Sequence, residues 1–461
     1  MKSRALALVQ RGQELLSGGS LRSRILRNVG WMAIAFGCDV FVRLISSMIL
    51  TRLLDPSAYG MISTVLIFMV FVTLLSDLGI KTIVAADERG DDGNFLSVLW
   101  TMQVVRGFLT AGVVCGIALL WMHAQTQRWI PPSSSYADPL LPKIALLISL
   151  SLVLQGFSSI NEYRLIRHLE RGAIARMDMI TRVFTAVVTV VLAFLFRSVW
   201  AIASGMVLTN VMRMLLSHLM LAGPRMRLHG DWTEIKRVMT LSRWVALNSF
   251  MTVLTTQADK FLIGYGFGLA TLGIYSLALT FYASAASVVD QLNSSLGIPV
   301  IRELLDKPED ERQRAYYKFR LPIEFYCVAA GTGIALFGPL FFKLAYDPRY
   351  EAGGVYFALL GIKIVLMPLH LASNFLFAQL RYKLMSLIGL VRSIIFLSGM
   401  TAAVWLHSIH LIVAVIALEN LPEIIAFFLY RRTGIPFQLR RDGGLLLLAA
   451  ALGAYLVLIV I

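Results

Sequence analysis

The feature that most constrains this chain is a succession of long apolar runs joined by short loops. Each run is close to the roughly 20 residues that a helix needs to cross the hydrocarbon core of a bilayer. Only 15% of the 461 residues are charged, against about 25% in a soluble domain. The sequence therefore predicts an all-α integral membrane protein with about 12 to 14 spans. We count thirteen: 28–52, 58–80, 95–122, 141–163, 174–197, 199–221, 240–264, 270–297, 320–344, 355–379, 383–405, 409–430 and 443–461.

The distribution of lysine and arginine predicts the orientation of these spans. Twenty-nine of the 42 basic residues fall on the side of the N-terminal arm and of the loops after even-numbered helices, whereas six fall on the other side. Basic residues collect on the cytoplasmic side of a membrane protein, so we expect a cytoplasmic N-terminus. This bias accounts for the net charge of +15 and requires no nucleic acid partner.

A weak internal repeat predicts the domain organisation. A shift of 213 residues aligns Gly60 with Gly273, Ser63 with Ser276 and Asp77 with Asp290. Parallel repeats of this kind enclose a midplane site in some transporters, which predicts two six-helix lobes around a central cavity. The expected parts are a basic arm at 1–27, a first lobe at 28–221, a cytoplasmic linker at 222–239, a second lobe at 240–430, and a loop with an extra C-terminal helix at 431–461.

Seven basic residues lie inside the predicted spans. Arg182, Arg243 and Lys260 are near helix ends, where long side chains can reach the headgroups. The other four lie roughly 12 to 22 Å into their helices at 1.5 Å per residue, and each costs about 2.5 to 3.5 kcal/mol on insertion scales. We expect these four to face a wet, cationic interior: Arg43, Arg106, Lys363 and Arg392.

The alternative interpretation of these cations is pairing with acids in the membrane. Asp39 with Arg43, and Asp178 with Arg182, have the i,i+4 spacing of a helical ion pair. Arg106 has no acid within a helical turn, and the same holds for Arg392, which favours a cationic cavity. Such a cavity predicts an anionic cargo, and the planar fork of arginine suits phosphate.

Intramembrane carboxylates are candidates for coupling transport to a gradient of H⁺ or Na⁺, with hydrogen bonding or ion pairing as the alternative role. The sequence has no ligand spacing for a metal and no motif for another cofactor. The candidate acids are Asp39, Asp77, Asp259, Asp290, Glu324 and Glu419.

Three segments resemble the signature segments of a known family. They are ILTRLLDPSAYGMIS at 49–63, LLSDLGI at 74–80 and ADKFLIGYGFGLATLGIYSLALTFY at 258–282. They are similar to the bacterial polysaccharide transporter family of the multidrug/oligosaccharidyl-lipid/polysaccharide flippase superfamily. The motifs occupy the opening pair of helices in each half, while the helix spacing matches along essentially the whole chain.

The resemblance implies a flippase of the bacterial inner membrane. Its cargo would be an undecaprenyl-pyrophosphate-linked oligosaccharide of O-antigen, capsule or exopolysaccharide, moved by alternating access. Membrane lipids, a polysaccharide polymerase and chain-length proteins would be its partners. A cation or drug antiporter of the same superfamily stays open, although four deep cations argue against it. A membrane polymerase or ligase would need a large outward loop, and 123–140 offers only His123, Arg128 and Asp138 as chemistry.

Overall fold

The computed structural model describes residues 21–131, 134–168, 170–240, 242, 256–379, 381–422 and 438–460. All regular structure in these ranges is helical, as the apolar runs predict. The chain divides into two compact units. Unit 1 comprises the described residues of Met1–Leu54, Phe68–Pro131 and Asp138–Val253, and unit 2 those of Asp55–Ile67, Pro132–Ala137 and Leu254–Ile461.

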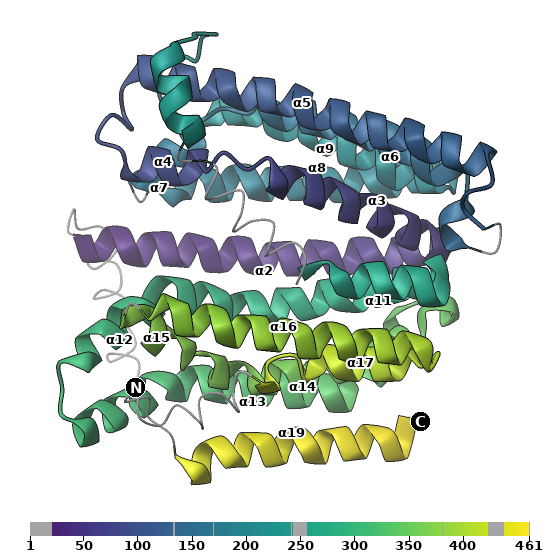
Figure 1. Cartoon of the computed structure of the whole chain (residues 1–461), viewed down its shortest axis with the longest axis vertical. Coiled ribbons are helices and arrows are strands. Elements are labelled where there is room, and N and C mark those ends of the chain that lie inside the picture. The colour runs from purple at the N-terminus through teal and green to yellow at the C-terminus, as the bar shows by residue number, and fades with distance from the viewer. Residues whose placement is uncertain are drawn as a thin grey trace, which may run out of the picture. The chain divides into compact units, whose positions relative to one another are not determined.

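Unit 1 is a bundle of long helices. The pairs α5 with α6, α8 with α9, and α2 with α8 pack along much of their lengths, and Figure 1 shows α5, α6, α8 and α9 running side by side. Gly107 of α5 and Gly156 of α6 face each other. Because glycine has no side chain, the two helix backbones can approach closely at this point. The helices are α2 (Leu21–Leu53), α4 (Ile80–Ala86), α5 (Gly93–Thr126), α6 (Leu140–Phe157), α7 (Asn161–Arg167), α8 (Arg171–Phe196) and α9 (Val199–Met220).

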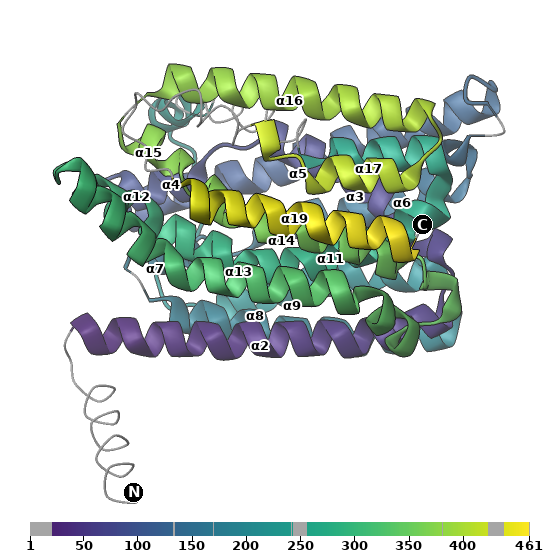
Figure 2. The same cartoon turned by 90° about the horizontal axis from the view of Figure 1, so that it is seen from below.

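Unit 2 contains the C-terminal helices. α14 packs against α13, α11, α17 and α19, and α13, α14 and α19 lie together in Figure 2. Its elements are η1 (Ser135–Ala137), α11 (Ala258–Leu292), η2 (Asn293–Gly297), α12 (Ile298–Leu305), α13 (Glu309–Ala345), η3 (Pro348–Tyr350), α14 (Gly353–His370), α15 (Ser373–Ala378), α16 (Tyr382–Trp405), α17 (Ile409–Ala417) and α19 (Leu439–Val460).

The predicted seventh and eighth spans meet at a glycine. Gly268 has φ +90° and ψ 170°, a conformation open to glycine at no steric cost, and it separates the two arms of α11. The second arm does not end at residue 297 as predicted. It continues through the π-helical η2 into α12, which ends at Leu305, because Pro299 falls in the first turn of α12, where its missing N–H is tolerated.

Helix α3 (Pro56–Leu75) divides between the units, and its first part, within 55–67, packs on α11 in unit 2. A Cβ on Gly60 would overlap with the backbone of Leu269, and a Cβ on Gly273 would overlap with the backbone of Pro56. The shift of 213 residues that aligns Gly60 with Gly273 also aligns Pro56 with Leu269. The contact is therefore reciprocal, as between two copies related by a two-fold axis, which supports the repeat.

Ten of the described helices are long and apolar enough to cross a membrane. They correspond to ten of the predicted spans, and the prediction of a multi-pass membrane protein is confirmed. The first predicted span lies within α2, while 240–264 and 409–430 are only partly among the described residues. The number thirteen therefore stays a prediction.

The extra C-terminal helix is an integral part of unit 2. Arg320 of α13 donates from Nη2 to Asp442 Oδ1 of α19 at 2.5 Å, and both side chains are only 2% exposed. The hydroxyl of Tyr317 also donates to Asp442. Because a charge in an apolar interior is tolerated only when it is paired, this contact fixes where α19 docks.

Candidate functional site

Asp39 of α2 joins two arginines of unit 1. Its Oδ2 lies 2.9 Å from Arg43 Nη2, one helical turn along, and its Oδ1 lies 2.8 Å from Arg182 Nη1 on α8. The carboxylate is 14% exposed, whereas the side chains of Arg43 and Arg182 are 31% and 49% exposed. The predicted pair of Asp39 with Arg43 is confirmed, and the group as a whole carries one surplus positive charge.

The second pair that the alternative interpretation allowed, Asp178 with Arg182, gives way to other partners. Asp178 instead accepts from Arg213 Nη1 of α9 at 2.5 Å. Arg213 also binds both oxygens of Glu162 through Nη2, at 3.0 and 3.1 Å. Asp178 is therefore paired with an arginine of the neighbouring helix α9. Arg182 pairs with Asp39, although we expected its side chain to extend to the headgroups.

Sequence analysis missed Arg213. It was counted with the basic residues on the side of the following loop, although it lies seven residues before the end of α9 at Met220. Its position within an apolar run was the signal that could have identified it. With two carboxylates for one guanidinium, this group has the opposite charge balance from the group around Asp39.

Arg106 of α5 has an acidic neighbour that its sequence surroundings do not reveal. Its Nη1 lies 3.9 Å from Asp77, and its Nη2 donates to the carbonyl of Thr73 at 3.2 Å. Asp77 lies in the turn between α3 and α4, where its Oδ1 accepts from the backbone N–H of Gly79 at 3.0 Å. The predicted span 58–80 therefore ends at Leu75, because Gly79 adopts φ 63° and breaks the helix.

Unit 2 holds a second set of polar groups between helices. Lys363 Nζ of α14 donates to Glu419 Oε2 at 2.7 Å and lies 5.6 Å from the ring centroid of Tyr282. Tyr275 donates its hydroxyl to Asp259 Oδ2 at 2.6 Å. Asp259 is 8% exposed, and its Oδ1 has no hydrogen-bond partner within the described residues.

The remaining predicted residues are more dispersed. Glu324 accepts from Arg320 Nε at 3.2 Å, and Lys260 donates to Gln257 Oε1 at 2.8 Å. Asp290 is exposed, with His370 and Lys363 as its charged neighbours. Arg392 is partly buried in α16, and Arg243 lies outside the described residues. Within the described ranges, no group of three or more His, Cys, Asp or Glu side chains is arranged to hold a metal ion.

Comparison with known proteins places the chain in a family of polysaccharide biosynthesis proteins. The family described as "Polysaccharide biosynthesis protein" matches residues 49–352. A membrane protein in the cps region of Klebsiella pneumoniae is 20% identical, over 72% of this chain and 66% of the relative. The succinoglycan biosynthesis transport protein ExoT of Rhizobium meliloti is 22% identical, over 63% of this chain and 55% of the relative. The matched region thus spans less than two thirds of either relative.

Solved structures agree with the chain at the level of the fold. An inward-facing MATE family transporter of the MOP superfamily superposes with a TM-score of 0.59 at 12% identity, covering 90% of this chain and 95% of that one. The lipid II flippase MurJ, in an inward closed conformation, gives a TM-score of 0.59 at 11% identity, covering 92% and 93%. The predicted fold class of an all-α integral membrane protein is confirmed.

Proposed function

The chain belongs to the polysaccharide biosynthesis protein family, and we propose that it moves an undecaprenyl-pyrophosphate-linked oligosaccharide across the bacterial inner membrane. The cargo enters from the cytoplasmic leaflet and leaves from the outer leaflet by alternating access. The relative ExoT carries a name that states transport in succinoglycan biosynthesis, and the likeness to MurJ supports a fold suited to flipping. A lipid-linked precursor of O-antigen, capsule or exopolysaccharide fits both.

The observation that carries this proposal is the sharing of one carboxylate by two guanidiniums. Asp39 holds Arg43 and Arg182 through one oxygen each, so neither arginine has the bidentate partner that its fork can bind. Both guanidiniums keep exposed area while Asp39 is largely covered. A pyrophosphate can therefore approach the arginines from their open side, and Asp39 positions them for it.

The proposed role of Asp39 is to hold two arginines in position for the cargo, and this role can be tested separately from that of a purely structural ion pair. Two arginines fixed 2.8 to 2.9 Å from one carboxylate repel each other once that carboxylate is neutralised. In Asp39→Asn, both arginines should therefore keep their charge, but their guanidiniums should no longer be held in a fixed orientation. Removal of one arginine leaves a neutral pair, which has little attraction for an anion.

The experiment measures surface polysaccharide in a strain that lacks the gene and carries a variant copy. Arg182→Ala and Arg43→Ala should each lower export by about 10-fold or more, the value of one charge-assisted hydrogen bond of 1.5 to 3 kcal/mol, at unchanged protein level in the membrane. Arg349→Ala is the matched control, because Arg349 lies outside the predicted spans and pairs with Asp347 and Asp55. Full export by both site variants would overturn the proposal.

We propose further that Arg106, Lys363 and Arg392 contribute to attracting the anionic cargo. Arg106→Ala and Arg392→Ala should abolish surface polysaccharide at normal protein level. Lys363 differs, because Glu419 neutralises it at 2.7 Å; Glu419→Gln should then strengthen cargo binding rather than weaken it. Equal losses from Lys363→Ala and Glu419→Gln would assign this pair a structural role instead.

We propose that Asp259, among the candidate acids, couples transport of the cargo to a gradient of H⁺ or Na⁺. A buried carboxylate oxygen without a donor is costly, and binding of a proton or a small cation at Oδ1 would remove that cost. Asp259→Asn should uncouple export from the gradient: export would persist at a reduced rate and become insensitive to a protonophore or to sodium removal. Export that stays sensitive in this variant would exclude Asp259.

The MATE likeness favours one second candidate, an antiporter of organic cations. Two arginines around a single aspartate oppose a cationic cargo, which would need a surplus of acids instead. The two functions separate in one strain: loss of drug resistance with intact polysaccharide would favour the antiporter.

A further inference from the structure

The linker that follows α9, residues 222–239, is held against the helices of unit 1 by hydrogen bonds. The carbonyl of Pro224 accepts from Asn161 Nδ2 at 3.3 Å, and the backbone N–H of His229 donates to Thr101 Oγ1 at 2.9 Å. Residues 232–240 are helical. Asp231 caps this segment by accepting from the backbone N–H groups of Thr233 and Glu234.

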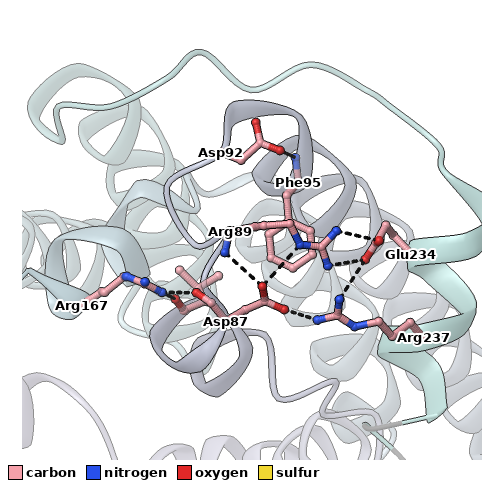
Figure 3. Close-up of polar contacts among 8 residues, drawn as sticks. Asp87, Arg89, Asp92, Phe95, Arg167, Glu234 and Arg237 are labelled. Carbon is pink, nitrogen blue, oxygen red and sulfur yellow. Dashed lines mark hydrogen bonds and ion pairs between the residues drawn. The ribbon is translucent and has the colours of Figure 1, made fainter.

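Charged side chains clamp the helical segment 232–240 to the turn after α4, as Figure 3 shows. Arg89 donates to both oxygens of Glu234, at 2.8 and 3.0 Å, and Arg237 donates to Asp87. Partial burial raises the pKa of Asp87, but hydrogen bonds from the Arg89 N–H and from Arg237 outweigh it and lower the pKa overall. The acids Glu234 and Asp87 are thus satisfied within the protein.

The helical segment has one face buried in unit 1 and another face open. Val238 is fully buried in a cluster with Ile80, Val84 and Phe95, and Ile235 packs against the same cluster. On the other side, Trp232 is 77% and Met239 54% exposed. Because Trp232, Lys236 and Met239 follow the i, i+4, i+7 spacing of one helical face, they form a single stripe.

The open stripe is bordered by unneutralised positive charge. Arg225, Arg227 and Lys236 are exposed, and no hydrogen bond or ion pair in the described part of the chain engages these three side chains. Leu228 lies among them and is also exposed. Exposed aromatic and aliphatic side chains next to basic ones are the composition of a helix that lies in the membrane interface.

We infer that residues 225–239 form a binding surface for anionic phospholipid headgroups. Helix α9 is a membrane span that ends at Met220, so this surface begins within five residues of the bilayer. Tryptophan is enriched at that depth, where its ring is apolar and its N–H is polar. Arg225, Arg227 and Lys236 contact the phosphates, while Trp232, Met239 and Leu228 enter the headgroup region.

The surface serves to hold the linker against the membrane. The ion pairs of Asp87 and Glu234 fix the buried face to unit 1, and lipid holds the open face. The inference requires only that α9 crosses the membrane, and it is independent of the cargo. Full export by the Arg43→Ala and Arg182→Ala variants, with intact lipid binding, would therefore refute the proposed function without touching this surface.

The test uses the full chain reconstituted in vesicles with brominated phospholipids, which quench nearby tryptophan. The signal of Trp232 is the difference between the wild type and Trp232→Phe. We expect brominated phosphatidylglycerol to quench it in preference to brominated phosphatidylcholine. Each basic residue near an anionic surface changes affinity about fivefold, so a triple variant of Arg225, Arg227 and Lys236 to Gln should lower this preference by about 100-fold.

The matched control removes the same charge from α12, α13 and the turn between them through Arg302→Gln, Lys307→Gln and Arg314→Gln, and should leave Trp232 quenching unchanged. Two results would overturn the inference. Quenching of Trp232 by aqueous acrylamide but by neither lipid would place the stripe in water. Protection from both quenchers would mean that protein, such as a second copy of this chain, covers it.

Discussion

Removing the carboxylate of Asp442 should weaken the packing of α19 against α13 in unit 2 and lower the thermal stability of this unit. In Asp442→Ala, Arg320 keeps its charge in a site that is 2% exposed, and the hydroxyl of Tyr317 loses its acceptor. Breaking a buried ion pair costs about 3 to 5 kcal/mol. Glu324 still accepts from Arg320 at 3.2 Å, so we expect the lower end, about 3 kcal/mol.

For a unit of roughly 200 residues, 1 kcal/mol corresponds to about 2 to 4 °C in Tm, which gives a loss of about 6 to 12 °C. A thiol-reactive dye can report the transition through Cys327, which is fully buried in α13. Arg349→Ala is the control, because its pair with Asp347 is exposed and such pairs contribute less than about 1 kcal/mol.

A double variant tests the reasoning itself. Arg320→Met with Asp442→Leu replaces both charges by apolar groups of similar size, which is often neutral or stabilising. We therefore expect it to recover most of the lost Tm. A Tm for Asp442→Ala within about 2 °C of the wild type, as for an exposed pair, would refute the claim that this ion pair anchors α19.

Two further predictions follow from local geometry. Gly60→Ala and Gly273→Ala should impair export equally, since each Cβ would overlap with backbone at the same reciprocal contact; a loss in one variant alone would contradict that symmetry. Hydrogen bonds from His168 and Arg164 lower the pKa of Asp91, despite partial burial, and the pKa of Asp87 is lowered too. Asp87 pairs with Arg237 of the linker and therefore stabilises it above the unfolded pKa of about 3.9. The protection of 232–240 from hydrogen exchange, measured relative to the intrinsic rate at each pH, should be constant from pH 8 to 5 and fall only below about pH 4. A loss of protection near pH 6 would contradict this assignment.

The apolar runs were sufficient to predict the helices, because a bilayer demands a length that can be counted along the chain. Ends were harder, since they depend on local turn chemistry. The span 58–80 stopped early at Leu75 because Asp77 and Gly79 build a turn. The run after Gly268 passed its expected end because a π-helical stretch lets it continue.

Pairing within one helix could be predicted, whereas pairing between helices could not. Asp39 and Arg43 share a helical face and meet as expected. Asp178 and Arg182 share one equally well, yet Arg213 on α9 takes Asp178. Which helices become neighbours is decided by packing over the whole unit, so Lys363 with Glu419, 56 residues apart, had no signal in the sequence.

The central claim is that Arg43 and Arg182 bind the pyrophosphate of the cargo. The direct measurement is translocation by the purified protein in vesicles, comparing a pyrophosphate-linked oligosaccharide lipid with the same oligosaccharide on an uncharged linkage. We predict that the wild type moves the charged lipid, and that Arg43→Gln with Arg182→Gln abolishes this movement while the protein stays folded. Movement of the charged lipid by the double variant at the wild-type rate would contradict the account.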